Sequence, residues 1–340
     1  MKYLLIATIF LLPTLGFAQF PTGIKNFKDG DFEQAILDFT AAIKQDSRNW
    51  DAWYNRALCK ELVGDHEGAL EDLRSVLNVR PYDSEAILHV GINELGLGQT
   101  DQAIITLTRC IEKIPTIDQD YQIIPLASKA YYHRALAHIE NDSIELAIKD
   151  LRRSVETDPP ALVSLFKLAN IKTDIGDYKG AIRNYDMYVN FQPYSAEVYN
   201  NRGLCKAALG NKLAAVRDFS NSLFVDSTNS QVYYNRGHEY FKLKEFEKAE
   251  ADFSKALKYD ENNKGALYYR AKLYGRVEAY TNEIQDLKKI IALDPTDEEA
   301  KDQLRLARIN RLMAQNWLFV GLAIILIGIT GYFVRRILKN

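Results

Sequence analysis

The sequence predicts an all-α fold, a solenoid of about eight consecutive helix pairs, and two observations lead to this prediction. The first is a period: Arg202, Arg236 and Arg270 follow one another at steps of 34 residues, and Arg134 precedes Arg202 by 68, twice that step. Repeats of this length are typical of solenoids made of helix pairs. The second is that small and large apolar residues recur at fixed places within each period.

Eight repeats follow from this period, starting at residues 16, 50, 84, 128, 162, 196, 230 and 264. Position 8 of each repeat is small: Gly23, Ala57, Gly91, Ala135, Ala169, Gly203, Gly237 and Ala271. Position 20 is alanine in all but the eighth repeat, where it is Glu283, and position 24 is a large apolar residue, from Phe39 to Leu287. Small residues let two antiparallel helices approach closely, and the large residue fills the seam on the same helical face.

The ends of the helices are also marked in the sequence. Turns such as "GDF", "GDH" and "GDY" lie between the two helices, and their glycine is expected to end the first helix in the left-handed conformation. After the second helix a proline such as Pro81 or Pro193 stops it, and Asp83 or Ser84 can cap the next.

These positions together resemble the tetratricopeptide repeat (TPR) family over most of the chain. The resemblance implies a right-handed α-solenoid whose first helices line a concave groove that binds extended peptides or partner helices. The chain departs from the family pattern at position 4, where tryptophan remains only as Trp53, and at Glu283 in the eighth repeat.

The remaining segments complete the predicted domain organisation. Residues 1–18 are predicted to be a signal peptide cut after Ala18, with an uncleaved anchor as the alternative. The TPR array covers 19–297 and contains an insertion, 118–127, which either extends the first helix of the fourth repeat or forms a loop. Residues 298–316 are predicted to be a capping helix, 317–334 a transmembrane helix without a charge, and 335–340 a cytoplasmic tail.

This organisation predicts a location. A signal peptide would carry the repeats out of the cytoplasm, so the protein is expected to be single-pass in the inner membrane, with a periplasmic TPR domain and a cytoplasmic C-terminus. The "GFAQ" junction resembles exported proteins of Bacteroidetes, which suggests a bacterial origin.

The recurring arginine is predicted to be structural. It stands at position 7, and the same repeats carry aspartate at position 23, whereas the third and fifth repeats lack both residues. Pairing within a repeat matches all five arginines, and pairing between neighbours does not. The predicted ion pairs are Arg56 with Asp72, Arg134 with Asp150, Arg202 with Asp218, Arg236 with Asp252, and Arg270 with Asp286.

Positions 5 and 6 of the first helices are expected to face the groove. The predicted partner-binding residues are Tyr54, Asn55, His89, Tyr132, His133, Phe166, Asn170, Asn201, Tyr234, Asn235 and Tyr268. Aromatic rings with amide donors suit the recognition of a peptide. His89 and His133 share a position, but a third ligand is missing, so no metal site is predicted.

The composition narrows the function classes. A formal net charge of −2 argues against nucleic acid, and three scattered cysteines form neither a disulfide framework nor a metal motif. Catalytic and phosphate-binding motifs do not stand out. The sequence therefore predicts a non-enzymatic, membrane-tethered scaffold without a cofactor, binding a protein or peptide partner in cell-envelope complex assembly.

Two alternatives remain open at this point. One is a cytosol-facing TPR receptor for chaperones or imported clients. Some TPR co-chaperones grip a terminal carboxylate with cations and asparagines; Asn170 and Asn201 fit the asparagine positions, but Phe166, Gln231 and Asn235 occupy the cationic ones. The other is an enzyme that uses the array to bind its substrate.

Overall fold

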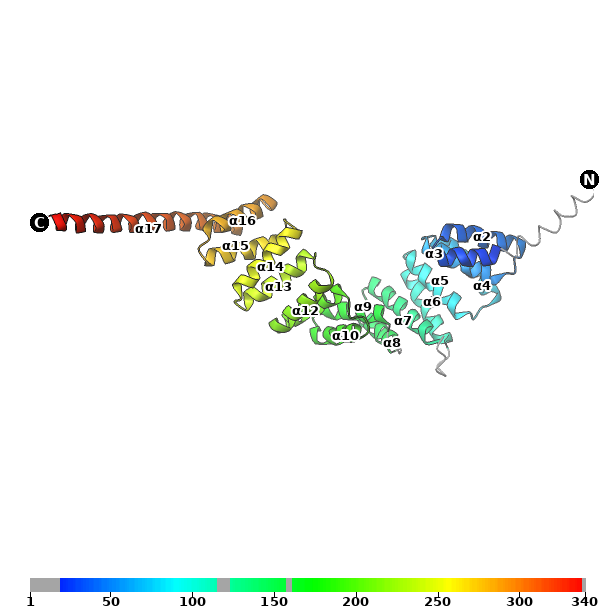
Figure 1. The fold of residues 1–340 in the computed structure, drawn as a ribbon. Coiled ribbons are helices and arrows are strands. Elements are labelled where there is room, and N and C mark those ends of the chain that lie inside the picture. Colours follow the sequence, from blue (N-terminus) through cyan, green and yellow to red (C-terminus); the bar gives the residue numbers. More distant parts are fainter. Residues whose placement is uncertain (1–18, 115–122, 157–160, 338–340) are drawn as a thin grey trace, which may run out of the picture. The chain divides into compact units, whose positions relative to one another are not determined.

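The computed structural model describes residues 19–114, 123–156 and 161–337, and within them the side chains of 123–124, 318–324, 328 and 331–337 are left aside. Every regular element in these residues is a helix, which confirms the predicted all-helical, solenoid-like fold (Figure 1). The chain divides into two compact units, residues 1–171 and 172–340, called here the N-terminal and the C-terminal unit. The predicted signal peptide, 1–18, lies outside the described residues.

Helices alternate as first and second members of successive repeats. Residues 19–29 are helical, and the later first helices are α3 (Trp50–Leu62), α5 (Ser84–Gly96), α7 (Ile123–Glu140), α9 (Leu162–Asp174), α11 (Ala196–Ala208), α13 (Ser230–Lys242) and α15 (Lys264–Arg276). The second helices are α2 (Phe32–Gln45), α4 (His66–Val79), α6 (Thr100–Lys113), α8 (Ile144–Val155), α10 (Tyr178–Phe191), α12 (Lys212–Val225), α14 (Phe246–Tyr259) and α16 (Tyr280–Leu293). The last helix is α17 (Glu298–Ile337).

The turn within each repeat depends on one backbone conformation at position 15. Its φ is positive in all eight repeats, and the residues are Gly30, Gly64, Gly98, Asp142, Gly176, Gly210, Lys244 and Glu278. Glycine adopts this conformation without steric cost, which explains its use in five of the eight turns. The aspartate after the glycine then caps the second helix in several repeats; Asp65 Oδ1, for example, accepts a hydrogen bond of 3.0 Å from the Gly68 amide.

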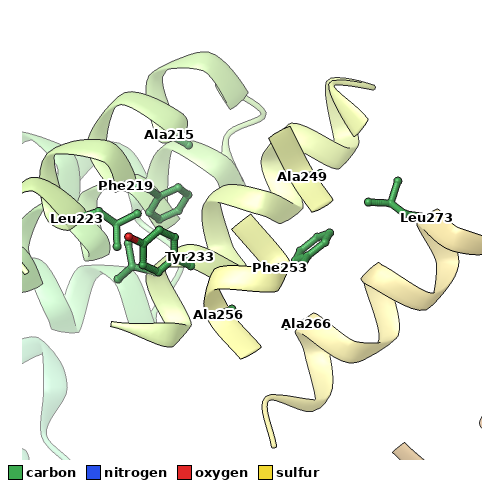
Figure 2. Packing of buried hydrophobic residues seen from close by; sticks show 10 residues of the cluster. Ala215, Phe219, Leu223, Tyr233, Ala249, Phe253, Ala256, Ala266 and Leu273 are labelled. Atoms are coloured by element: carbon green, nitrogen blue, oxygen red, sulfur yellow. The ribbon is translucent and has the colours of Figure 1, made fainter. Parts of the chain in front are cut away.

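Position 8 is small because the large residue at position 24 lies directly against it. A Cβ atom on Gly203 would lie 2.8 Å from the ring of Phe219, and one on Gly237 would lie 2.9 Å from the ring of Phe253. Figure 2 shows Phe253 pointing from α14 toward α15, and both phenylalanines belong to one buried cluster of the C-terminal unit. The predicted close approach of the two helices is thus a ring packed on a glycine backbone.

The eighth repeat shows how Glu283 fits where the other repeats have alanine. A Cβ atom on Gly275 would lie 2.8 Å from Glu283 Oε1, so the glutamate occupies space that the glycine leaves free. Burial raises the pKa of Glu283. The glutamate at position 20, unusual for this array, is therefore accommodated by the glycine at position 12.

Part of the insertion, residues 123–127, forms the beginning of α7. This helix begins at Ile123 and has 18 residues, whereas the other labelled first helices have 13. Residues 123–127 thus extend the first helix of the fourth repeat, one of the two expected outcomes. Residues 118–122 of the insertion lie outside the described part of the chain.

The predicted location in the inner membrane, as a single-pass protein with a periplasmic array and a cytoplasmic tail, is wrong. Among the helices of the described residues, none is both long and apolar enough to cross a lipid bilayer. The predicted capping helix and the predicted span form one continuous helix, α17. The side chains of 318–324, 328 and 331–334 in the predicted span lie outside the described residues.

Candidate functional site

The five arginines at position 7 each reach the aspartate of their own repeat. Arg236 is representative: its Nε and Nη2 donate to the two carboxylate oxygens of Asp252, both at 2.8 Å. The other four pairs have the same two-pronged geometry, with donor–acceptor distances of 2.6 to 2.9 Å. The aspartates are buried. Both carboxylate oxygens of each aspartate are occupied by the arginine, so the pair serves to link the two helices of a repeat rather than to bind a ligand.

Each arginine also has partners that the sequence did not indicate. Its Nη1 donates to a side chain of the preceding repeat at position 25: Thr40, Thr108, Asp186, Ser220 and Ser254. In four of the repeats the guanidinium also lies 4.9 to 5.7 Å from the ring at position 4: Trp53, Tyr131, Tyr199 and Tyr233. The arginine therefore links three helices across two repeats.

Position 25 explains the two repeats that lack the arginine. Before the third and the fifth repeat this position is Arg74 and Arg152, so a position-7 arginine would face a like charge there. In the third repeat Arg74 lies close enough to act electrostatically on the buried Glu94, and it opposes the burial that raises the pKa of this carboxyl group. In the third repeat, the cation near the buried carboxylate thus comes from position 25 of the preceding repeat. The sequence could have shown this, because an arginine at position 25 precedes both the third and the fifth repeat, which lack one at position 7.

In the N-terminal unit, the predicted groove residues form a polar network across first helices. His89 Nδ1 lies 3.0 Å from Glu61 Oε2, and Asn93 Nδ2 donates to the same oxygen at 2.6 Å. The ring of Tyr54 meets that of His89 edge to face, with centroids 5.9 Å apart. His66 of α4 approaches Asn93 Oδ1 at 2.9 Å. Because α3 contacts α5, the side chains of these two helices share one face, and α7 continues it because it contacts α5.

Burial controls the protonation of this network. The pKa of His133 falls to about 4, chiefly because the half-buried ring is desolvated, with the His89 and Lys129 charges lowering it further and Glu61 opposing. His133 is therefore neutral at pH 7 and can both donate and accept a hydrogen bond. Burial and the nearby carboxylates raise the pKa of Tyr54, so its phenol remains protonated.

Other predicted residues of this unit are placed as follows. Tyr132 is half-buried beside His133, with ring centroids 5.2 Å apart. Asn55 Nδ2 donates to the Asp51 carbonyl of its own helix at 2.7 Å. Phe166 and Asn170 lie half-buried on α9.

In the C-terminal unit, aromatic residues dominate the corresponding face. Tyr234 of α13 stacks on His238, and its ring lies 6.1 Å from that of Tyr269 on α15. The Tyr269 hydroxyl and His238 Nε2 are 3.0 Å apart. A Cβ atom on Gly265 would collide with the Tyr234 ring, so this glycine makes room for the stack.

The amides of this unit join first helices to one another. Asn235 is buried, donates to Asn200 Oδ1 at 3.1 Å and accepts from Gln231 at 3.0 Å. Asn201 accepts from Asn200 Nδ2 at 3.2 Å. The Tyr268 hydroxyl donates to Glu299 of α17 at 3.0 Å. Asn235 thus makes contacts within the array, and Tyr234 and Tyr268 remain half-buried at its face.

Sequence reasoning missed three residues of these faces, namely Glu61, Asn93 and His238. Each of them lies four or seven residues after a predicted groove residue on the same helix, and side chains at these spacings share a helical face. Extending the face by one or two turns beyond positions 5 and 6 would have found them.

The three cysteines are buried, and the described residues show no cluster of metal-ligating side chains. Cys59, Cys110 and Cys205 are buried, and burial raises the pKa of Cys59 to about 11 and that of Cys110 to about 12, so the thiolate is disfavoured. Within the described part of the chain, no group of three or more His, Cys, Asp or Glu side chains is arranged to hold a metal ion.

Comparison with known proteins agrees with this architecture. Sequence profiles described as tetratricopeptide repeat match residues 26–86, 128–160 and 230–263. The chain contains TPR repeats. The TPR profiles fall in both units, and each matched segment includes at least one complete helix that the structure describes.

Individual relatives of the TPR chain share fold more than sequence. A Hsp70-Hsp90 organizing protein of Triticum aestivum is 26% identical over 201 residues, which cover 55% of this chain and 31% of that protein. The C-terminal part of a TPR repeat-containing protein from Cytophaga hutchinsonii has a TM-score of 0.52 at 16% identity, covering 84% of this chain and 99% of that one. PilW, a type IV pilus biogenesis factor, has a TM-score of 0.52 at 19% identity, covering 62% and 92%.

Proposed function

We propose that this TPR protein is a non-enzymatic scaffold whose first-helix faces bind an extended peptide or a helix of a protein partner. TPR proteins serve as protein–protein interaction scaffolds, and proteins with this fold are typically not enzymes. The observation that carries the proposal is the contact of successive first helices, which brings Tyr54, His89 and His133 from three repeats to one face.

The chemistry of the two faces suits a peptide ligand. Half-buried rings with polar ends offer large contact area at a low cost in side-chain entropy. The network of Glu61, His89 and Asn93 holds its members in place, so little order is lost on binding. The expected place of the partner, a cell-envelope complex, comes from the sequence alone and stays a prediction.

A chaperone receptor of the carboxylate-clamp type is not favoured. The chain spans 31% of the Hsp70-Hsp90 organizing protein that it matches, so that protein's partners do not carry over directly. The three positions that would need cations hold Phe166, Gln231 and Asn235, and Asn235 is buried in contacts with Gln231 and Asn200.

The test is selection of peptides from a random library displayed on phage, followed by fluorescence anisotropy with the selected peptides. We expect Tyr132→Ala and Tyr234→Ala to weaken binding by about tenfold, the loss of one aromatic contact of about 1.4 kcal/mol. Tyr82→Ala and Tyr194→Ala are matched controls, because both rings are largely exposed away from these faces. Equal binding by all four variants, with unchanged helical circular dichroism, would exclude the faces as the site.

A further inference from the structure

The first half of α17 repeats the pattern of a first helix. Residue 298 follows the start of the eighth repeat by one period of 34, so α17 starts at position 1 of an incomplete ninth repeat. Ala300, Leu304 and Ala307 at positions 3, 7 and 10 are buried in one cluster with Leu287 and Ile290 of α16. This is the contact that a first helix makes with the preceding second helix.

The ninth repeat has no second helix, because α17 does not turn. Position 15, which has a positive φ in all eight repeats, is Leu312, and α17 continues as a helix to Ile337. Leucine in the left-handed conformation is strained, so the sequence favours the continuous helix. The surface on which a second helix would pack therefore has no covering helix from the described residues.

A cationic pocket lies at this end of the array. Its cavity is about 290 Å³, and its lining consists of Ile284 and Lys288 from α16 with Arg308, Arg311 and Leu312 from α17. Among the described residues, no carboxylate forms an ion pair with any of these three cations. Three cations around one cavity attract an anionic group.

Complete repeats of this chain show which group belongs beside such a cation. Arg308 stands at position 11, where the second and sixth repeats carry Lys60 and Lys206. Lys60 Nζ lies 3.0 Å from Asp72, and Lys206 Nζ lies 2.7 Å from Asp218. Both aspartates are at position 23 of a second helix. In these two repeats, therefore, the second helix brings a carboxylate to the position-11 cation, whereas the fifth repeat has Lys172 at position 11 and Asn184 at position 23.

The apolar residues beside the pocket can also be compared with the same positions in a complete repeat. Ile309 stands at position 12, and its side chain is 49% exposed. In the seventh repeat this position is Phe241, which packs edge to face on Phe246 of the second helix, with ring centroids 5.8 Å apart. Ile309 thus presents apolar surface of the kind that the second helix covers in the seventh repeat, and the exposed Leu312 lies next to it on α17.

We propose that this pocket is a second binding site, which accepts an amphipathic helix of a partner protein carrying an aspartate next to a large apolar residue. The helix takes the place of the missing second helix: its carboxylate pairs with Arg308 and Lys288, and its apolar residue covers Ile309 and Leu312. The site is separate from the first-helix faces, so it does not depend on the function proposed for them.

The test uses the full chain and a fluorescent peptide with the sequence of α14, "FEKAEADFSKALKY", which contains the aspartate and phenylalanine of a second helix. Anisotropy should show binding that falls by about tenfold with Arg308→Glu or Lys288→Glu, the loss of one charged contact. The matched control is Arg305→Glu, because Arg305 is exposed, pairs with Asp302 on the same helix and does not line the pocket. A peptide with Asp252→Asn should also bind more weakly.

Several outcomes would overturn the proposal. These are absence of peptide binding at about 1 mM, equal binding by the Arg308→Glu and Arg305→Glu proteins, and loss of binding in Tyr234→Ala alone, which would assign the peptide to the first-helix face. Arg308-dependent self-association in sedimentation experiments would assign the pocket to a second copy instead. Circular dichroism of each variant excludes unfolding as the cause of a loss, and Arg308→Gln provides a milder change at the same position.

Discussion

Replacing Arg236 by valine should lower the local stability of the seventh repeat, so that α13 and α14 separate more often. In the native chain two hydrogen bonds of 2.8 Å join Arg236 to Asp252, whose side chain is 6% exposed. Each hydrogen bond to a charged group contributes about 1.5 to 3 kcal/mol, and leaving one partner of a buried pair alone costs about 3 to 5 kcal/mol. Because the arginine side chain is itself 18% exposed and water can reach its place, we expect a loss of about 3 kcal/mol in local stability.

The third repeat supplies a compensating change. It has Val90 and Thr106 where the seventh has Arg236 and Asp252, so Arg236→Val with Asp252→Thr recreates a pair that the fold already contains. The double variant removes the stranded carboxylate and should recover at least half of the loss. Arg217→Val is the control, because Arg217 is exposed.

Hydrogen exchange of peptides from α13 and α14, read by mass spectrometry, measures the local opening free energy directly. Global melting is less suitable, since a repeat array need not unfold as one cooperative unit. A loss below about 1 kcal/mol in the single variant, or a double variant as unstable as the single one, would refute the assignment of the arginine as a buried link.

Three further predictions concern packing, pH and thiol reactivity. Gly237→Ala should cost about 1 to 3 kcal/mol in thermal or urea unfolding, because its Cβ meets the Phe253 ring, and Phe253→Leu should relieve part of that cost; an unchanged midpoint would contradict the contact. The pKa of His133 is about 4 in the folded chain and about 6.5 unfolded, so its contribution to stability should be constant well above pH 6.5 and fall by roughly 3 kcal/mol as the pH is lowered through 6.5 to 4. His133→Gln should flatten this dependence in urea titrations, and an unchanged slope would argue against it. Cys59 and Cys110 should react with a thiol reagent only after denaturant is added, and rapid labelling of the native protein would show that they are accessible.

Much of the fold was predictable because its contacts recur at fixed sequence separations. Position 8 meets position 24 within one repeat, and the ring of Phe219 on Gly203 repeats that of Phe253 on Gly237, so one period identifies the contact for every repeat. The candidate faces were less predictable. Glu61, His89 and Asn93 meet because α3 lies beside α5, and the separation of 28 or 32 residues between them is not part of the repeating pattern.

The sequence by itself determined the helix pairs, their turns and the pairing of position 7 with position 23, since these follow from local propensity and from packing within 34 residues. Only the tertiary structure showed that each position-7 arginine also donates to a position-25 side chain of the preceding repeat. It also showed that Asn235 is buried between helices and that Lys288 and Arg308 line one cavity. Such contacts join side chains of different repeats, and their geometry depends on how the repeats stack on one another.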